Sequence, residues 1–451
     1  MKDKKVLIIG LGNSGKAAAE AMVGLGAEVY VQDIKSEDKI DPQLMTFLKE
    51  NAVECFLGRT PDDMSVFDML IVSPGVPLDL GFIKEAKDAG TEIIGELEVA
   101  YRTGKGKYVA ITGTNGKTTT TTLVGEIYKA SGRTTHVVGN IGVAVISKAL
   151  TTSDEDWLVT ECSSFQLESI KDFKPEVSAI LNLTPDHLDR HKTMENYGDA
   201  KAQIFANQDS SQYCVVNYDD KACFALAEKC EAKVVPFSRK EELDFGAYVS
   251  EDKIVIKDEA GAVTEFCRVD ELKIPGSHNL ENALAACAIG YFGGIDASVI
   301  SEVLRTFAGV EHRIELCDTI KGVRYVNDSK GTNPDAAIKA IEAMKENIIL
   351  IAGGYDKNSE YDEFTAAFEG RVKALLLLGT TAAKIKEAAE KAGFTEVKIL
   401  DDMEACVNEA YSMAEPGDVV LLSPACASWD MYKSFEHRGR HFKECVSRLE
   451  R

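Results

Sequence analysis

Several features that would assign a protein to another class are missing from this sequence. It has no apolar stretch as long as a membrane-spanning helix, no C-x-x-C pair, no internal repeat and no low-complexity linker. Its 11 cysteines are scattered, and most lie in apolar runs, which favours buried thiols in a reducing compartment. We therefore expect a cytoplasmic protein without a disulfide framework and without a membrane partner.

Positive charge is also scarce, with 51 basic against 73 acidic residues and a formal net charge of −22. A chain of this charge is a poor partner for nucleic acid or for an anionic membrane surface. It can still bind small anions, because backbone N–H groups and a few lysines create a local positive site. The charge thus excludes broad polyanion binding and leaves phosphate-containing ligands open.

The chain has 451 residues, enough for two to four domains. Short β-branched or leucine-rich runs alternate with longer helical patterns. Such runs are typical of strands that helices bury on both faces of a parallel α/β sheet. They are Val6–Ile9, Met69–Val72, Tyr108–Thr112, Trp157–Thr160, Ala179–Leu183, Ile348–Ala352, Ala374–Leu378 and Val419–Leu422.

The alternation divides the chain into three predicted domains, 1–95, 96–309 and 310–451. The first ends before a polar, glycine-bearing joint at Tyr101–Lys107. Within the second, residues 234–275 have the pattern of short antiparallel strands and hairpins. The third returns to strand–helix alternation, so an α/β fold is expected throughout.

A glycine-rich loop follows the apolar run that ends at Thr112 and precedes a helical pattern at Thr121–Ala130. Gly113 and Gly116 let backbone N–H groups turn inward at a helix N-terminus, where a phosphate is stabilised. Lys117 would then reach the terminal phosphates, and the following threonine hydroxyl would bind Mg²⁺. The loop is two residues shorter than the usual phosphate loop; the alternative is a glycine turn capped by threonines.

A second glycine pattern, Gly10-Leu-Gly12-Asn-Ser-Gly15, also follows a strand and opens a helix. Asp33 ends the next strand, where an acid can accept a hydrogen bond from a ribose hydroxyl. The pattern suits a nicotinamide dinucleotide and equally a nucleotide-sugar diphosphate, because both present a pyrophosphate to a helix N-terminus. A plain tight turn is the third alternative. Ser73–Pro77 forms another turn at the same sheet edge and could line the site.

Polar residues follow two of the central strands. Glu161 ends one of them, and Asn182, Asp186 and His187 follow the next. Carboxylates at a strand end near a phosphate loop commonly hold Mg²⁺. His187 is one of only seven histidines, which adds weight to a second metal position. Lys201 lies in a helical stretch and receives no role from the pattern alone.

These motifs together resemble the Mur ligases of peptidoglycan synthesis over essentially the whole chain. The first five of the segments below are shared across this superfamily, which includes folylpolyglutamate synthases, and the last two point to the members that add D-glutamate. The segments are Thr112–Thr119, Gly139–Gly142, Glu161–Leu167, Asn182–His187, Gly276–Asn282, His312-Arg313, Asn327–Asn333 and Ser423–Asp430.

The resemblance implies three domains. They are a Rossmann-like domain for a UDP-linked substrate, a central phosphate-loop ATPase domain, and a Rossmann-like amino-acid domain. The central sheet is expected to be mostly parallel, with a small antiparallel sheet beside it. The implied reaction is the ATP-dependent addition of D-glutamate to UDP-N-acetylmuramoyl-L-alanine through an acyl phosphate.

The resemblance also implies ligand contacts. Those for ATP are Gly113, Thr114, Asn115, Gly116, Lys117, Thr118, Thr119, Asn279, Asn282, Arg313, Asp328 and Lys330. Those for the UDP-linked substrate are Asn13, Ser14, Asp33, Lys35, Gly75, Asn140 and His187, and those for D-glutamate are Thr332, Lys357, Ser428, Trp429 and Phe435.

The implied catalytic residues are Lys117, Glu161, His187 and Lys201. Two Mg²⁺ ions are expected at Thr118, Glu161, His187 and Lys201, because Lys201 matches a lysine that the family carbamylates into a carboxylate-like ligand. We also expect a monomer.

The chain departs from the family at Lys35 and Trp429, so the shapes of the uridine and D-glutamate pockets stay open. Three other functions compete with the implied one. They are another amide ligase of the same architecture, an oxidoreductase that binds NAD(P) at the N-terminal glycines, and a nucleotide-binding regulatory protein without turnover. The oxidoreductase alternative leaves the loop at Gly113 and the acid at Glu161 unexplained.

Overall fold

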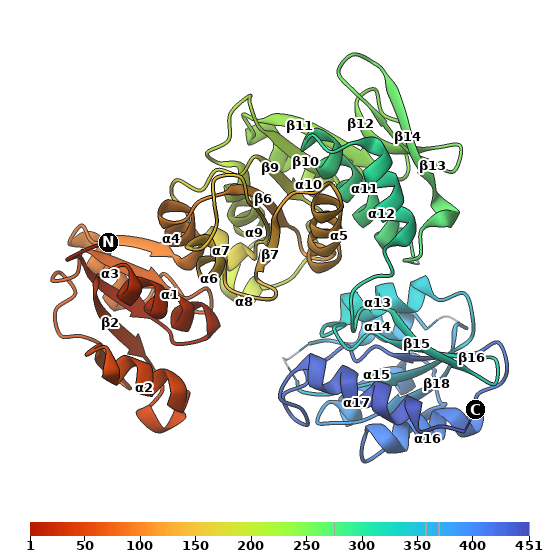
Figure 1. Cartoon of the computed structure of the whole chain (residues 1–451). Coiled ribbons are helices and arrows are strands. Elements are labelled where there is room, and N and C mark those ends of the chain that lie inside the picture. The colour runs from red at the N-terminus through yellow and green to blue at the C-terminus, as the bar shows by residue number, and fades with distance from the viewer. Residues whose placement is uncertain (275, 357–358, 369, 451) are drawn as a thin grey trace. The chain divides into compact units, whose positions relative to one another are not determined.

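The computed structural model describes residues 1–274, 276–356, 359–368 and 370–450. Contacts within the chain divide it into two compact units, each built from sheets and helices (Figure 1). The first unit comprises Met1–Glu271 and Glu281–Arg305, and the second comprises Leu272–Leu280 and Thr306–Arg451. No helix within the described ranges is both long and apolar enough to cross a membrane.

The first sheet is parallel throughout, with the strand order β3-β2-β1-β4-β5. Its strands are β1 (Lys5–Ile9), β2 (Glu28–Asp33), β3 (Glu54–Leu57), β4 (Met69–Val72) and β5 (Glu92–Gly95). Val6 and Ile8 of β1 belong to one apolar cluster, while Leu7 and Ile9 belong to another. Because side chains alternate between the faces of a strand, both faces of this sheet are covered.

The central sheet has the order β14-β13-β12-β11-β10-β9-β6-β8-β7. Its strands are β6 (Lys107–Thr112), β7 (Thr135–Gly139), β8 (Trp157–Glu161), β9 (Val177–Ile180), β10 (Tyr213–Asn217), β11 (Lys233–Ser238), β12 (Gly246–Ser250), β13 (Lys253–Lys257) and β14 (Val263–Arg268). The pairs from β7 to β12 are parallel, whereas β13 runs antiparallel to β12 and to β14. The antiparallel strands therefore extend the edge of the same sheet (Figure 1).

The third sheet lies in the second unit and has the order β15-β16-β20-β17-β18-β19. Its strands are β15 (Glu315–Ile320), β16 (Val323–Asn327), β17 (Ile348–Ala352), β18 (Val372–Leu377), β19 (Val397–Ile399) and β20 (Val419–Leu422). Among the described strands of this sheet, β15 and β16 pair in antiparallel fashion, and the other neighbouring strands pair in parallel. Since β20 inserts between β16 and β17, loops from all three strands meet at their carboxyl ends.

The helices fill the connections between these strands. Those before residue 150 are α1 (Asn13–Gly24), η1 (Glu37–Lys39), α2 (Pro42–Glu50), α3 (Gly81–Asp88), α4 (Glu96–Thr103), α5 (Lys117–Ala130) and α6 (Val145–Ala149). The middle of the chain contains α7 (Ser164–Leu167), α8 (Leu188–His191), α9 (Met194–Ala202), η2 (Gln203–Phe205), α10 (Lys221–Leu226), η3 (Ala227–Lys229), η4 (Val269–Glu271), α11 (Ser277–Phe292) and α12 (Ala297–Thr306). The remaining helices are α13 (Pro334–Ala343), α14 (Asp362–Ala366), α15 (Ala382–Lys391), α16 (Met403–Met413) and α17 (Phe435–Ser447).

The predicted α/β fold is confirmed, and each apolar run named above falls on a strand. The run at Ala179–Leu183 differs most, because β9 ends at Ile180 and the next residues leave the sheet to hold the glycine loop. The predicted helix at Thr121–Ala130 begins earlier, at Lys117, directly after a left-handed Gly116. The domain boundaries at residues 95 and 309 stay a prediction.

A buried carboxyl group joins two helices of the first unit. Glu96 begins α4 and is 2% exposed. One of its oxygens accepts a hydrogen bond from the backbone N–H of Ile146 in α6 at 2.6 Å, and the other, Oε2, has no partner. Burial raises the pKa of Glu96 to about 7, because the charged form has lost its water.

A buried arginine organises the second unit. Arg438 of α17 is 1% exposed and donates to the backbone oxygens of Ser329, Cys426 and Ala427 at 2.8, 3.1 and 3.1 Å. It also donates to the Ser329 hydroxyl at 3.0 Å. Burial lowers its pKa to about 10. The loops that follow β16 and β20 are therefore held to one guanidinium group.

The Glu96 carboxyl should make stability depend on pH. Its pKa is higher in the folded protein than in the unfolded chain, so the free energy of unfolding should fall as pH rises from about 4.5 to about 7. Glu96→Gln removes this dependence. Relative to the wild type, the variant should gain about 3 kcal/mol over that range, measured by urea unfolding at several pH values.

The exposed Glu126→Gln serves as the matched control, since Glu126 lies in the same unit beside Lys129 at the surface. It should follow the wild-type pH profile. A constant difference between Glu96→Gln and wild type from pH 4.5 to pH 7 would contradict the argument.

Arg438→Met should destabilise the second unit by at least about 3 kcal/mol, because three buried carbonyl groups and a hydroxyl lose their donor. Denaturant unfolding of the full chain measures this loss. Arg448→Met, at the exposed end of the same helix, should change stability by less than about 0.5 kcal/mol. Equal effects of the two substitutions would refute the role of Arg438.

Candidate active site

Three neighbouring strands of the central sheet bring the predicted polar residues to one edge. β6 lies between β8 and β9, with Ile111 paired to Glu161 and Thr112 paired to Ile180. Because all three strands are parallel, the segments after their carboxyl ends emerge side by side. These segments are the glycine loop, the acid at position 161 and the Asn182–His187 segment.

The glycine loop has the conformation that its sequence requires. Gly113 and Gly116 have φ values of +149° and +81°, which residues other than glycine rarely adopt. A Cβ at Gly116 would lie 2.2 Å from Oδ1 of Asn282, so the backbone of the loop approaches α11 closely. Lys117 folds back over the loop and donates to the backbone oxygens of Gly113 and Thr114 at 2.9 and 2.8 Å.

The segment after β9 holds this loop from the other side. The Asn182 side chain accepts from the N–H of Asn115 at 2.8 Å and donates to its carbonyl at 3.1 Å. The N–H of Thr114 donates to the Asn182 carbonyl at 3.1 Å, and the Thr114 hydroxyl donates to the Thr184 carbonyl at 3.1 Å. Asn182 is therefore a clamp on the loop, a role that its position in the sequence did not reveal.

Glu161 presents one free oxygen at this edge. Its Oε1 accepts from Nδ2 of Asn140 at 2.9 Å, while Oε2 is buried and has no partner. Gly139 allows the close approach, because a Cβ there would lie 2.3 Å from the Glu161 carbonyl. A buried carboxylate oxygen without a donor is costly unless a cation or a further donor satisfies it. Together with the buried hydroxyl of Thr118, it provides the oxygen ligands that Mg²⁺ prefers.

Lys201 is buried beside the loop. It is 1% exposed, its Nζ donates to the Gly113 carbonyl at 2.8 Å, and it lies 4.4 Å from the centre of the Tyr197 ring. Burial lowers its pKa well below the ordinary lysine value, and the neighbouring Lys117 ammonium lowers it further. Both effects disfavour the charged form of Lys201, which the sequence pattern could not indicate.

His187 lies at the same edge, half-exposed and in a left-handed conformation with φ +54°. Its Nε2 is 3.5 Å from Asp186, and its ring meets the Phe165 ring edge-on at 4.9 Å. Burial lowers the pKa of His187, and Lys117 and Lys201 lower it further against the opposing charge of Asp186. A neutral imidazole, the form that binds metals, is therefore favoured.

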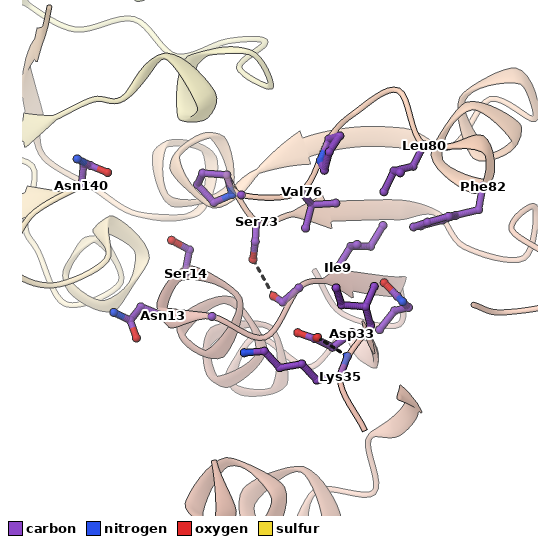
Figure 2. Close-up of a pocket in the computed structure, with 17 residues that line it drawn as sticks. Ile9, Asn13, Ser14, Asp33, Lys35, Ser73, Val76, Leu80, Phe82 and Asn140 are labelled. Carbon is purple, nitrogen blue, oxygen red and sulfur yellow. Dashed lines mark hydrogen bonds between the residues drawn. The ribbon is translucent and has the colours of Figure 1, made fainter. Parts of the chain in front are cut away.

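The first sheet carries a pocket of about 660 Å³ above its glycine turn. Six of the seven residues predicted to contact the UDP-linked substrate line it, namely Asn13, Ser14, Asp33, Lys35, Gly75 and Asn140. Figure 2 shows Asn140 on the side of the pocket where Asn13 and Ser14 lie. The seventh, His187, is not among the lining residues. Ile34 also lines the pocket and is 88% exposed, an apolar surface that the sequence pattern missed.

Asp33 is oriented by the backbone. Its Oδ2 accepts from the N–H of Leu11 at 2.7 Å. Its Oδ1 accepts from the N–H of Lys35 at 2.9 Å, as Figure 2 shows. The carboxylate therefore links the glycine turn to the end of β2. Each oxygen keeps a second lone pair that can accept from a ligand hydroxyl.

In the second unit the loop after β16 carries a buried acid. Asp328 accepts from the Ser423 hydroxyl at 2.7 Å and from the N–H of Ile314 at 3.3 Å. Burial raises its pKa to about 7, while the charge of Arg313 opposes that rise. Nε of Arg313 is buried without a hydrogen-bond partner. Lys330 lies over the Phe435 ring at 5.3 Å.

Four of the five residues predicted to contact D-glutamate follow strands of the same sheet as this acid. Thr332 follows β16, while Ser428, Trp429 and Phe435 follow β20. Trp429 is 64% exposed and packs against Tyr355, which follows β17, with ring centres 5.6 Å apart. Lys357 lies outside the described residues.

Glu311, His312 and Glu315 come close enough together to suggest a metal site within the described residues. Two contacts argue against it. The Asn327 amide donates to Nδ1 of His312 at 2.9 Å, so the proton of a neutral ring lies on Nε2. Lys443 also donates to both carboxylates. These contacts occupy Nδ1 of His312 and both carboxylates, whereas the buried Nε2 of His312 has no hydrogen-bond partner.

Known proteins resemble this chain over its full length. Family profiles match at residues 4–95 (Mur ligase MurD-like, N-terminal domain), 111–290 (Mur ligase middle domain) and 312–426 (Mur ligase, glutamate ligase domain). A protein of Alkaliphilus oremlandii named UDP-N-acetylmuramoylalanine–D-glutamate ligase is 53% identical over 455 residues, which cover 100% of both chains. A protein of the same name from Clostridioides difficile is 51% identical over 100% of this chain and 99% of its own.

Solved structures share the fold at low sequence identity. The UDP-N-acetylmuramate-alanine ligase MurC of Thermotoga maritima has a TM-score of 0.60 at 20% identity, covering 98% of this chain and 99% of that one. A pseudomurein peptide ligase of Methanothermus fervidus has a TM-score of 0.58 at 18% identity, covering 99% and 100%. The three-domain α/β architecture is thus common to these proteins.

Proposed function

The chain belongs to the Mur ligase family, and on this premise we propose that it joins D-glutamate to UDP-N-acetylmuramoyl-L-alanine at the expense of ATP. One observation carries the proposal. In a chain that matches ligases of this name from end to end, the glycine loop lies beside Glu161, whose buried Oε2 has no partner. A phosphate loop next to an unsatisfied carboxylate is suited to phosphoryl transfer with a divalent cation.

The loop residues bind the ATP phosphates in this proposal. Gly113 to Thr119 supply backbone N–H groups at the start of α5, where the helix favours an anion. The ammonium of Lys117 leaves the carbonyl groups that it now contacts and turns to the phosphate oxygens, which are stronger acceptors. Asn282 supports the loop from α11, since its Oδ1 accepts from the Thr120 hydroxyl at 3.2 Å.

The family uses Mg²⁺ with ATP, and the residues at this edge fit that ion. We assign Thr118 and Glu161 to one ion, and His187 with a carbamylated Lys201 to a second. Bound Mg²⁺ would offset negative charge on the phosphate oxygens. The buried Oε2 of Glu161 and the neutral imidazole favoured at His187 support the assignment.

Carbamylation of Lys201 is supported by its environment. A neutral amine can attack CO₂, forming an N–C bond and releasing one proton, and burial favours the neutral form of Lys201. The product carries a carboxylate-like group close to the Lys117 ammonium, which its negative charge stabilises. Because both side chains meet at the Gly113 carbonyl, the carbamate would lie beside Lys117 and supply a ligand for a cation.

The reaction then proceeds in two steps. A carboxylate oxygen of the muramoyl-L-alanine substrate attacks the γ-phosphorus of ATP, and ADP leaves. The neutral amine of D-glutamate attacks the acyl carbon, and phosphate leaves with the electrons of the broken C–O bond. Lys117 stabilises charge on the transferring group, so positioning and electrostatics supply most of the acceleration.

The remaining contacts are proposals from the family pattern. The pocket above the first sheet accepts the UDP moiety, supported by its size and by the six predicted residues that line it. Asn279, Arg313, Asp328 and Lys330 are proposed for ATP, and the residues proposed for D-glutamate are Thr332, Lys357, Ser428, Trp429 and Phe435. The use of ATP supports a cytoplasmic location, and a monomer without nucleic-acid partners stays a prediction.

An amino-acid panel tests the function. With ATP, Mg²⁺ and UDP-N-acetylmuramoyl-L-alanine, phosphate release should require D-glutamate and proceed at least tenfold faster than with L-lysine, diaminopimelate or L-glutamate. Turnover with a different amino acid, or with a folate and L-glutamate, would identify another ligase of the same architecture. Binding of a nicotinamide nucleotide without phosphate release would favour the oxidoreductase alternative.

Lys201→Ala should lower turnover at least 100-fold, because one proposed metal ligand is lost. Added formate or acetate should restore part of the rate, since a small carboxylate can occupy the space of the carbamate. Lys117→Ala is the matched control: it removes the neighbouring ammonium, and short carboxylates should not restore its activity. Full activity of Lys201→Ala, or equal rescue of both variants, would refute the carbamate.

A further inference from the structure

One arginine connects the pocket of the first sheet to the central sheet. It does so near the carboxyl ends of β6, β8 and β9, where the glycine loop, Glu161 and the Asn182–His187 segment meet; we call this place the phosphate edge. Arg190, the third residue of α8, is largely buried, with 16% of its side chain exposed. One guanidinium nitrogen donates both to the Val76 carbonyl at 3.1 Å and to Oε2 of Glu168 at 2.6 Å. Neither Arg190 nor Glu168 is among the residues proposed above to contact a ligand.

On the pocket side, Arg190 contacts the turn that forms a wall. The N–H of Val76 donates to the Ser73 carbonyl at 2.9 Å, and the Ser73 hydroxyl donates to the Gly10 carbonyl at 2.7 Å (Figure 2). A Cβ added at Gly10 would lie 2.9 Å from Cγ2 of Val76. The turn at Ser73–Val76 is therefore packed against the glycine turn at Gly10. Arg190 binds the first of these turns through the Val76 carbonyl.

On the other side, Arg190 belongs to a cluster around Glu168. Oε1 of Glu168 is 3.3 Å from Nδ1 of His191, whose Nε2 is 2.9 Å from the Ser164 hydroxyl. Ser164 opens α7 only three residues after Glu161. The guanidinium of Arg190 also lies 5.2 Å from the centre of the Phe165 ring.

The same ring carries the connection to His187. Phe165 meets the His187 ring at 4.9 Å and stacks on the His191 ring at 5.4 Å. The Arg190 side chain thus contacts the wall of the pocket, the carboxylate of Glu168 directly after α7, and the Phe165 ring against which His187 packs. Because each link is a direct contact, a change at Arg190 would shift the pocket relative to the phosphate edge.

We propose that Arg190, oriented by Glu168, is a positioning residue that fixes the register between the nucleotide-sugar pocket and the phosphate edge. The inference rests on the proposed function. A substrate anchored by its UDP moiety must present a distant carboxylate to the γ-phosphate, and Arg190 fixes the geometry of that presentation. A shift of about 1 Å in such a geometry can cost about 100-fold in rate, even when both ligands still bind.

The test is a kinetic comparison of Arg190→Met with the wild type. Its kcat should fall about 30- to 100-fold, whereas the KM for ATP and the calorimetric Kd for the UDP-linked substrate should change less than threefold. Arg190→Lys keeps one charged donor without the planar fork, so it should recover part of kcat. Glu168→Gln should lower kcat in the same way as Arg190→Met.

Two controls separate positioning from stability. Arg102→Met removes an arginine of similar exposure that pairs with Glu92 and Glu98 in the same unit, away from the pocket wall. It should lower the thermal midpoint without lowering kcat by more than threefold. In the double variant Glu168→Gln/Arg190→Met, kcat should fall no further than in Arg190→Met, because both substitutions break the same connection.

Three results would overturn the inference. They are a normal kcat in Arg190→Met, a loss that appears only as a weaker Kd for the UDP-linked substrate, and multiplicative losses in the double variant. If Arg190→Met does not fold, the same comparison is made with Arg190→Lys and Glu168→Gln, in which kcat should fall while the Kd for the UDP-linked substrate stays unchanged. These outcomes differ from failure of the proposed function, in which the wild type itself releases no phosphate with D-glutamate.

Discussion

The carbonyl oxygen of Gly113 accepts hydrogen bonds from two lysines, and the rest of the phosphate edge depends on this contact. Lys117 is the first residue of α5, directly after the loop, and Lys201 is a buried residue of α9. Burial disfavours a charge on Lys201, and repulsion from the Lys117 ammonium on the same acceptor disfavours it further. The site therefore requires anionic groups, from phosphate, from Glu161 or from a carbamate, to become electrostatically balanced.

The loop reaches this contact because the fold constrains it from several directions. Its glycines remove the Cβ atoms that would clash, and Asn182 holds its backbone with a pair of hydrogen bonds. Arg438 has a similar role in the second unit, where its buried guanidinium donates hydrogen bonds to the loops after β16 and β20. In both units a rigid polar contact positions loops that carry the proposed ligand contacts, as pre-organised sites require.

The sequence allowed the sheets, the glycine turns and the ends of the strands to be predicted, because each leaves a local pattern. Apolar runs mark β17 and β20 to the residue, and the glycines at 113 and 116 mark the loop. Arg190 and Glu168 left no such signal. They are 22 residues apart in sequence, and their partner Val76 is more than a hundred residues from Arg190. Only their closeness to two recognisable segments could have drawn attention to them, since Arg190 follows Asn182–His187 and Glu168 follows Glu161–Leu167.

The sequence by itself determined the phosphate loop, the acid at the end of β8 and the family to which they point, because spacing and residue type are local properties. The tertiary structure alone decided that Lys201 is buried against Gly113, that Oε2 of Glu161 is without a partner and that Asn182 clamps the loop. These facts depend on which strands lie side by side. The order of β8, β6 and β9 in the sheet brings distant residues together, and burial then sets their charge.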